Sequence, residues 1–244
     1  MADVLWDHYD AVLFDLDGVV TPTAEVHMRA WSAMFNDYLR GVPGQPPYTD
    51  EDYYAYVDGK PRYDGVRTLL HARGIDLPEG DPTDGPDADT VSGLGNRKND
   101  YFSKVLADEG VEAYPGSVRL LDALRDRGIP MGIVSSSRNA PAVLAAAGVT
   151  DYFRTVMHGG VAAERQLAGK PAPDTFLAAA ADLGATAERA VVLEDAISGV
   201  QAGAAGRFGL VIGVDRGAGA DALTAGGADV VVADLAELVP ADAR

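Results

Sequence analysis

The chain has 244 residues, carries a net charge of −17 and contains no cysteine. This length suffices for a substantial core and for one domain with an insertion, whereas the missing cysteines exclude disulfides and thiolate metal sites. The negative charge disfavours nucleic acid and anionic lipid as partners, and no apolar run approaches the ~20 residues of a membrane helix.

The first seven residues are acidic and lack the basic and apolar regions of a signal peptide. Together with the composition, they predict a cytoplasmic enzyme without a membrane or nucleic-acid partner. The acidity itself is explained most simply by solubility. It would also repel a phosphorylated substrate, so basic residues near a substrate cleft would matter disproportionately.

An apolar run at residues 11–16 predicts a strand that is buried on both faces, as in a parallel sheet. Asp15 and Asp17, followed by Gly18, then stand at its carboxyl end, where open α/β sheets bind their ligands. One carboxylate there can be a covalent nucleophile and a second an acid and base, and such oxygens also suit Mg2+. The simpler alternative is a turn, where Asp and Gly are common.

The next part of the chain predicts a helical insertion. Helices are expected at 23–39, 63–73 and 96–108, with an aromatic, acidic segment at 48–56 between the first two. Residues 74–90 are rich in Pro, Gly and Asp, so we expect a surface loop there. The Tyr-Pro-Gly sequence at 114–116 marks the return to the main domain.

Strands and helices alternate in the remainder of the chain. Helices are expected at 117–127, 140–147, 174–183 and 198–204, and strands at 129–134, 155–157, 190–193, 210–213 and 229–233. This alternation predicts an α/β fold, with helices on both faces of a parallel sheet. Right-handed crossovers would then bring four polar side chains to one edge: Asp15, Ser135, Lys170 and Asp195.

Residues 14–19 (FDLDGV) resemble the first motif of the haloacid dehalogenase superfamily. Three further motifs of that family occur in the same order. They are a strand ending in Ser or Thr, matched by 129–135, a lysine before a helix, matched by 169–174, and an acidic pair ending a strand, matched by 191–195. The resemblance implies a Rossmann-like, three-layer parallel-sheet core.

The resemblance implies that Asp15 is the nucleophile of a phosphoryl transfer. Ser135 would donate a hydrogen bond to the transferring group, and Lys170 would pair with the phosphate and with Asp15. The structural alternatives are a helix cap for Ser135 and a solvated lysine for Lys170. Pro171 favours the functional alternative for Lys170, because it places this lysine just before a helix start.

A Mg2+ cofactor is implied by the same motifs. Asp15, Glu194 and Asp195 would hold it, together with the backbone carbonyl of Asp17, and it would reduce the repulsion between nucleophile and phosphate. The structural alternative for the acidic pair is helix capping, because residues 196–200 begin a helix. Both roles are compatible.

Within the superfamily, the chain is most similar to the β-phosphoglucomutase-like group, whose members insert a small helical cap after the first motif. The similarity covers 21–31, 97–100, 135–139 and 170–174. It implies a core domain of residues 1–21 and 110–244, and a cap domain of residues 22–109.

The resemblance to this group extends to substrate contacts. Asp17 would be the general acid and base, and Ser136 would line the transferring phosphate beside Ser135. Thr23 and His27 would steer Asp17 and contact the substrate. The expected ligands of the second phosphate are Arg62, Lys98, Ser137, Arg138 and Asn139.

The helical spacing of Thr23, His27 and Trp31 independently places them on one face. Two polar residues with a tryptophan are unusual for plain core packing, although a lone histidine on a helix is more often structural. Arg62 and Lys98 would by default be solvated side chains.

Two departures from the group leave the substrate open. Asp58 stands where the group has a basic residue, with Lys60 displaced by two positions, and the 74–90 loop is long. These features leave both a mutase, which must exclude water, and a phosphatase, which admits it, as alternatives.

The leading hypothesis is a β-phosphoglucomutase-like phosphotransferase that interconverts β-hexose 1-phosphate and 6-phosphate. The second is a phosphatase of sugar phosphates or other small phosphomonoesters. A third hypothesis is a non-catalytic phosphosugar-binding module, which the intact motifs disfavour because such a module need not keep Asp15. A dehalogenase is also disfavoured, because halide displacement needs no Mg2+ pair such as Glu194 and Asp195. The expected partner is a small phosphorylated sugar, and the expected state is a monomer.

Overall fold

A computed structural model describes residues 4–240 of the chain, so the first three residues of the acidic N-terminal segment lie outside the described residues. The chain divides into two compact units, Met1–Pro22 with Val111–Arg244, and Thr23–Gly110. Within residues 4–240, no helix combines the length and the apolar character that a membrane crossing requires.

The first unit is built on a parallel sheet that has six strands within residues 4–240. Their order is β3-β2-β1-β4-β5-β6, which is the Rossmann order, and the predicted fold class is confirmed. The strands are β1 Ala11–Phe14, β2 Met131–Val134, β3 Thr155–Met157, β4 Ala190–Glu194, β5 Leu210–Val214 and β6 Val230–Val232.

Strand β1 lies at the centre of the sheet, where the strand order reverses. Phe14 is in register with Ile133 of β2 on one side and with Leu193 of β4 on the other. All four residues of β1 are buried, because neighbouring strands cover both edges and helices cover both faces. Sheets of this kind bind their ligands beside the carboxyl ends of the strands at this reversal, which here are β1 and β4.

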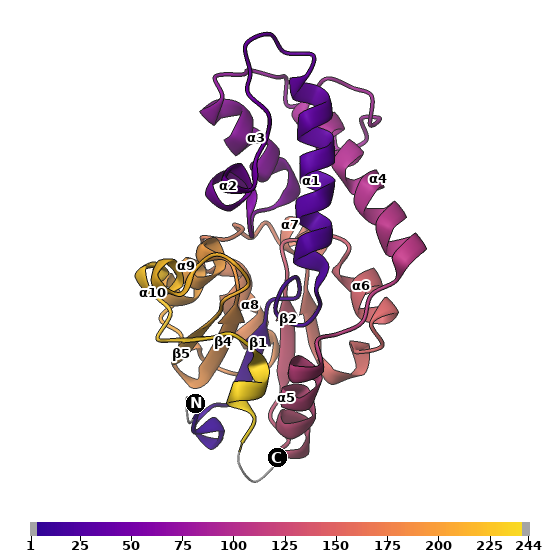
Figure 1. The fold of residues 1–244 in the computed structure, drawn as a ribbon. Helices are drawn as coiled ribbons and strands as arrows, with labels where there is room; N and C mark the ends of the chain where they lie inside the picture. The colour runs from indigo at the N-terminus through magenta and orange to yellow at the C-terminus, as the bar shows by residue number, and fades with distance from the viewer. Residues whose placement is uncertain (1–3, 241–244) are drawn as a thin grey trace. The chain divides into compact units, whose positions relative to one another are not determined.

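Helices cover both faces of the sheet in the first unit (Figure 1). Helices α8, α9 and α10 pack on one face, and α5 and α6 lie on the other, as right-handed crossovers require. Their bounds are α5 Pro115–Asp126, α6 Ala140–Ala146, α8 Asp174–Asp182, α9 Ile197–Ala205 and α10 Ala220–Gly226. The three-layer prediction is therefore confirmed.

Some element bounds differ from the sequence-based expectation. Helix α10 and helix α7 (Gly159–Glu164) were not predicted, because short segments rich in glycine and alanine lack a clear apolar period. Strand β2 begins at Met131 rather than at 129, since Pro130 has no N–H to donate to a neighbouring strand.

The Thr23–Gly110 unit is helical. It contains α1 Thr23–Leu39, α2 Asp50–Asp52, the π-helical turn η2 Tyr53–Val57, α3 Arg62–Ala72 and α4 Val91–Glu109. Helix α4 packs on α1 and α3 around buried apolar side chains. These include Met34, Phe35, Leu69 and Leu94.

Helix α4 begins at Val91, five residues before the predicted start at 96. The side chain of Thr90 accepts a hydrogen bond from the N–H of Gly93 at 2.9 Å and so caps the helix. The loop predicted at 74–90 is confirmed, since these residues form neither helix nor strand.

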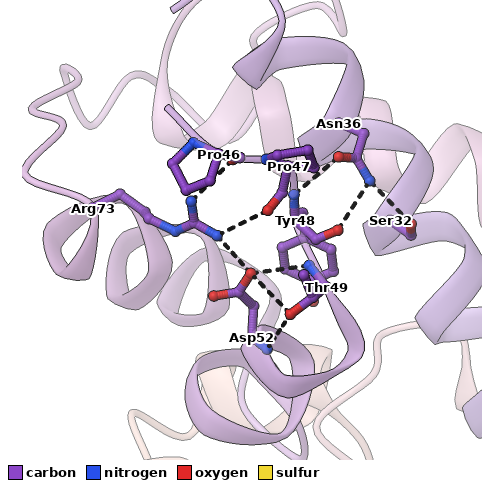
Figure 2. A network of polar contacts seen from close by, with 8 residues as sticks. All are labelled: Ser32, Asn36, Pro46, Pro47, Tyr48, Thr49, Asp52 and Arg73. Carbon is purple, nitrogen blue, oxygen red and sulfur yellow. Dashed lines mark hydrogen bonds and ion pairs between the residues drawn. The ribbon is translucent and has the colours of Figure 1, made fainter. Parts of the chain in front are cut away.

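A polar network holds the segment before α2 against α3 (Figure 2). The Arg73 guanidinium donates to the carbonyls of Pro46 and Pro47 at 3.0 and 3.2 Å, and to Asp52 Oδ2 at 2.6 Å. Asp52 Oδ2 also accepts the N–H of Thr49 at 2.9 Å. One ion pair therefore holds α2, α3 and the segment between α1 and α2 together.

The same segment is held to α1 by Asn36 (Figure 2). Asn36 Oδ1 accepts the N–H of Tyr48 at 2.9 Å, and its Nδ2 donates to the Tyr48 carbonyl at 3.4 Å and to Ser32 Oγ at 3.2 Å. A side-chain amide thus satisfies both backbone groups of Tyr48, as a strand partner would.

Replacing Arg73 with methionine is expected to lower the free energy of unfolding by about 2–3 kcal/mol. Both partners are largely buried, with 12% and 14% of the Arg73 and Asp52 side chains exposed, so the change leaves a carboxylate and two carbonyls with fewer donors. Chemical denaturation would measure the loss.

The control for this prediction is Arg40→Met. Arg40 pairs with Asp37 on the same unit, but 76% and 49% of these side chains are exposed, so the expected change is below about 0.5 kcal/mol. Equal losses for the two variants would show that the Arg73 network does not stabilise the unit.

Candidate active site

Asp15 and Asp17 stand in a backbone turn that directly follows β1. The N–H of Asp15 donates to the carbonyl of Leu193 at 2.9 Å, so Asp15 extends the pairing of β1 with β4. The chain then reverses: the N–H of Gly18 donates to the Thr21 carbonyl at 2.7 Å, and Asp17 forms a bridge with Thr21. The turn therefore projects both aspartates from one strand end.

Two glycines let the acidic pair at the end of β4 pack against the backbone. A Cβ atom added to Gly18 would lie 1.8 Å from Asp195 Oδ2, and one added to Gly199 would lie 1.8 Å from Glu194 Oε1. Gly18 also has a φ of +94°, which favours glycine. Sequence reasoning missed Gly199, whose only signal is its position in the first turns of the helix after the acidic pair.

Lys170 links the carboxyl ends of three neighbouring strands. It lies in the loop before α8, and 1% of its side chain is exposed. Its Nζ donates to Asp15 Oδ1 at 2.5 Å, to the Val134 carbonyl at 3.0 Å and to Glu194 Oε1. One cation thus contacts residues at the carboxyl ends of β1, β2 and β4, so the solvated alternative for Lys170 is wrong.

Negative charge exceeds positive charge among these buried groups. Burial raises the pKa of Asp15 well above its usual range, and the charges of Glu194 and Asp17 raise it further, while Lys170 opposes them. Burial disfavours the charged form of Lys170, but Asp15 and Glu194 outweigh this effect and raise its pKa. One lysine therefore does not balance the carboxylates.

The residues expected to hold Mg2+ fit this cation by their chemistry, because they combine hard carboxylate oxygens with a deficit of positive charge. In residues 4–240, no group of three or more His, Cys, Asp or Glu side chains is already arranged as a metal site. Glu194 instead holds Lys170 through Oε1 and accepts the N–H of Ala196 through Oε2 at 2.8 Å. Sequence reasoning did not predict this lysine-holding role of Glu194.

Ser135 lies beside Asp17 at the end of β2. Its Oγ donates to Asp17 Oδ2 at 3.4 Å and accepts the N–H of Ser137 at 3.1 Å. The remaining residues predicted to bind phosphate from this loop are its neighbours Ser136, Ser137, Arg138 and Asn139. The first unit therefore brings Asp17 and Ser135 together near the Asp15–Lys170 pair.

In the helical unit, Lys98 of α4 meets the predicted polar face of α1. Lys98 Nζ contacts His27 Nδ1 and lies 5.0 and 5.1 Å from the ring centroids of Trp31 and Phe102. The His27 ring stacks on Phe102 with 4.1 Å between centroids, and Thr23 is buried one turn earlier. Lys98 is thus held by aromatic rings and an imidazole, and the solvated alternative is wrong.

Arg62, the first residue of α3, is held by two asparagines of α4. Its guanidinium donates to Asn96 Oδ1 at 3.3 Å and to Asn99 Oδ1 at 2.6 Å, and the Tyr63 hydroxyl donates to Asn96 Oδ1 at 3.0 Å. Sequence reasoning missed the positioning role of this pair. The sequence signal for this pair is that Asn96 and Asn99 are three positions apart, which puts both side-chain amides on one face of α4.

The predicted site residues fall into two groups. The strand ends of the first unit carry Asp15, Asp17, Ser135, Ser136, Ser137, Arg138, Asn139, Lys170, Glu194 and Asp195. The helical unit carries Thr23, His27, Arg62 and Lys98. The chemical roles of both groups stay predictions.

Comparisons with known proteins agree with this fold and these motifs. The chain is 48% identical to the β-phosphoglucomutase of Mycobacterium bovis over 241 residues, which covers 94% of this chain and 91% of that protein. It is 30% identical to the fructose-1-phosphate phosphatase YqaB of Escherichia coli, covering 81% of this chain and 93% of that protein. The crystal structure of a Clostridium difficile β-phosphoglucomutase shares the fold, with a TM-score of 0.77, 24% identity and coverage of 94% of this chain and 93% of that one.

A family model for haloacid dehalogenase-like hydrolases matches residues 9–207. This match includes β1, β2 and β4, whose ends carry the aspartates, the serine and the acidic pair, as well as the loop with Lys170. The chain therefore belongs to the haloacid dehalogenase-like hydrolase family of enzymes.

Proposed function

We propose that this enzyme interconverts β-hexose 1-phosphate and 6-phosphate through an aspartyl-phosphate on Asp15. The observation that carries the proposal is the Lys170 contact with Asp15, beside Asp17 and Ser135 at the edge of a parallel sheet. The identity with a β-phosphoglucomutase over nearly the whole of both chains supports the substrate class.

In the first half-reaction, a carboxylate oxygen of Asp15 attacks the phosphorus atom, and the bond from phosphorus to the leaving oxygen breaks. Asp17 gives its proton to that oxygen. Lys170 and the Ser135 hydroxyl bind the oxygens of the transferred group. The ion pair with Lys170 favours the ionised form of Asp15 and so opposes the effect of burial, which raises its pKa.

In the second half-reaction, Asp17 takes the proton of the sugar hydroxyl as its oxygen attacks the phosphorus atom. The bond to Asp15 then breaks and the carboxylate is regenerated. One aspartate thus acts as acid and then as base, which microscopic reversibility requires of a reaction that runs in both directions.

Mg2+ fits the charge deficit at this site and would be held by Asp15, Asp195, Glu194 and the carbonyl of Asp17. When bound, it supplies positive charge to the transferred phosphoryl group. The lysine-holding contact of Glu194 supports a further role for this residue in placing Lys170 against Asp15.

We further propose that residues 22–109 act as a cap domain and supply cations for the second phosphate of a sugar bisphosphate. In this unit, Arg62 is held by two asparagines, and Lys98 lies against a histidine and two aromatic rings. A guanidinium can bind phosphate through two parallel hydrogen bonds. Arg138 of the core loop is a third expected ligand.

Replacing Arg62 with alanine is expected to lower kcat/KM for a sugar bisphosphate by about 10- to 100-fold, because charge-assisted hydrogen bonds contribute roughly 1.5 to 3 kcal/mol. Hydrolysis of acetyl phosphate, which lacks a second phosphate, should change little. Steady-state kinetics on both substrates would measure the two effects.

Arg67→Ala is the control, since Arg67 lies on the same helix and pairs with the exposed Asp64 and Glu79. It should leave both rates within about twofold. If Arg62→Ala slows both substrates alike, or neither, Arg62 is not a ligand of the second phosphate.

A phosphatase is the second candidate function, favoured by the similarity to a fructose-1-phosphate phosphatase and by Asp58 in place of a basic residue. Product analysis by 31P NMR separates the two. With Mg2+ and a trace of glucose 1,6-bisphosphate, β-glucose 1-phosphate should yield glucose 6-phosphate. Inorganic phosphate as the main product would instead establish the phosphatase.

A pure binding module is disfavoured, because binding does not require the buried Asp15–Lys170 pair.

A further inference from the structure

Arg216, which follows β5, touches the turn that carries Asp17. Its Nε donates to the carbonyl of Gly18 at 2.9 Å, and one terminal nitrogen donates to the carbonyl of Ala233 at 3.0 Å. Its guanidinium carbon lies 4.1 Å from the centroid of the Tyr114 ring. Sequence reasoning gave this arginine no role.

The Gly18 carbonyl belongs to a turn with little freedom on its other sides. The N–H of Gly18 donates to Thr21 within the turn. Asp195 fills the space beside the Gly18 α-carbon, where an added Cβ would lie 1.8 Å from Asp195 Oδ2. Arg216 holds the carbonyl of the same residue, one peptide after Asp17.

The start of α5 supports the same turn and also packs on Arg216. The N–H of Tyr114 donates to the Val20 carbonyl at 2.9 Å, and Ser117 Oγ donates to the Val19 carbonyl at 2.7 Å. The Tyr114 ring lies on the guanidinium. Arg216 therefore contacts residues 15–22, through which the chain leaves the core for the helical unit, and residues 111–114, through which it returns to the core.

The other side of the guanidinium is fixed to the C-terminal part of the core. Besides the hydrogen bond to Ala233, a terminal nitrogen lies 3.9 Å from Asp234 Oδ2. Only 21% of the Arg216 side chain is exposed. The side chain is therefore held on one side by residues 233–234 and reaches the Gly18 carbonyl on the other.

We propose that Arg216 is a positioning residue, which fixes the carboxyl group of Asp17 for proton transfer by holding the Gly18 carbonyl. The inference rests on the proposed acid and base role of Asp17. A displacement of about 1 Å in a reacting group can cost about 100-fold in rate, so a hydrogen bond one peptide away from Asp17 affects catalysis without contact to the substrate.

The test compares Arg216→Met with Arg189→Met. Arg189 is a matched control, because it also makes two hydrogen bonds, to Asp10 at 3.0 and 2.7 Å, but at the amino end of β4. Arg216→Met should lower kcat for β-glucose 1-phosphate about 10- to 100-fold, yet change turnover of p-nitrophenyl phosphate less than about threefold, because a stable leaving group needs little protonation. Arg189→Met should leave both rates within about twofold.

Amide hydrogen exchange gives a readout that does not depend on activity. In Arg216→Met, peptides that cover residues 15–22 should exchange about tenfold faster, the loss expected from one hydrogen bond to a charged donor. Arg189→Met should leave this segment unchanged. Arg216→Lys, which keeps one charged donor, should recover part of both effects.

Two results would overturn the positioning role: unchanged exchange in residues 15–22, or equal slowing of both substrates by Arg216→Met. The wild-type enzyme tests the proposed function separately. If it does not convert β-glucose 1-phosphate, the mutase proposal fails, whereas the exchange comparison still decides whether Arg216 holds the turn.

Discussion

Replacing Asp15 with asparagine is expected to lower turnover at least about a thousandfold while the protein stays folded. An amide oxygen cannot form the acyl-phosphate, and the variant keeps the shape of the wild-type side chain. The fold should tolerate the neutral group because burial already raises the pKa of Asp15 and so disfavours its charge. Steady-state kinetics and a thermal unfolding curve would measure the two effects.

Asp10→Asn is the matched control for this prediction. Asp10 pairs with Arg189 just before β1, at the opposite end of the strand from Asp15, and both side chains are about half exposed, at 50% and 51%. Turnover in this variant should stay within about twofold of wild type. Near-normal turnover by a folded Asp15→Asn protein would contradict a covalent intermediate on this residue.

Removing divalent cations is expected to lower activity at least about 100-fold, and Mg2+ should restore it. The reason is electrostatic: burial and the charges of Glu194 and Asp17 raise the pKa of Asp15 although Lys170 opposes them, and a phosphate dianion adds further negative charge. Activity after EDTA treatment and after Mg2+ addition would test this, together with calorimetric titration of Mg2+ into the protein.

Asp195→Asn should weaken Mg2+ binding in that titration, since it removes one carboxylate from the donor set. The exposed Asp221 of α10 offers the same substitution away from the sheet edge, and Asp221→Asn should bind Mg2+ like wild type. Full activity in EDTA, or restoration by Zn2+ alone, would contradict the Mg2+ assignment.

The fold class could be predicted because its signals are local. Buried strands such as β1 are continuous apolar runs, and their alternation with helices implies a parallel sheet. The order of the strands was not predicted, because apolar runs such as β4 and β5 do not specify their neighbours. Helix α7 was missed for a related reason: six residues carry too little periodicity.

The residues at the strand ends could be found because motif and topology agree. Asp15 and Lys170 are 155 residues apart in the chain, yet right-handed crossovers bring their strand ends to one edge. The contacts around them could not be predicted. Whether Glu194 faces Lys170 or a metal depends on rotamers and on the space left by Gly199, which no sequence pattern encodes.

The contacts of the arginines could not be predicted from the sequence either. Arg62 was singled out through resemblance, but its partners Asn96 and Asn99 became evident only from the packing of α3 on α4. Arg216 had no signal of its own, because its hydrogen-bond acceptors are the backbone carbonyls of Gly18 and Ala233. Carbonyl acceptors occur at every residue, so they leave no trace in the sequence.

The proposed mechanism requires a phosphoryl group carried by Asp15, and trapping that intermediate tests it most directly. The enzyme would be mixed with Mg2+ and acetyl phosphate, quenched in acid and analysed by intact mass, then reduced with borohydride and digested. We expect one added phosphoryl group before reduction and conversion of Asp15 to homoserine in the peptide that contains β1. Modification of another residue, or turnover without any phosphorylated enzyme, would contradict an aspartyl-phosphate on Asp15.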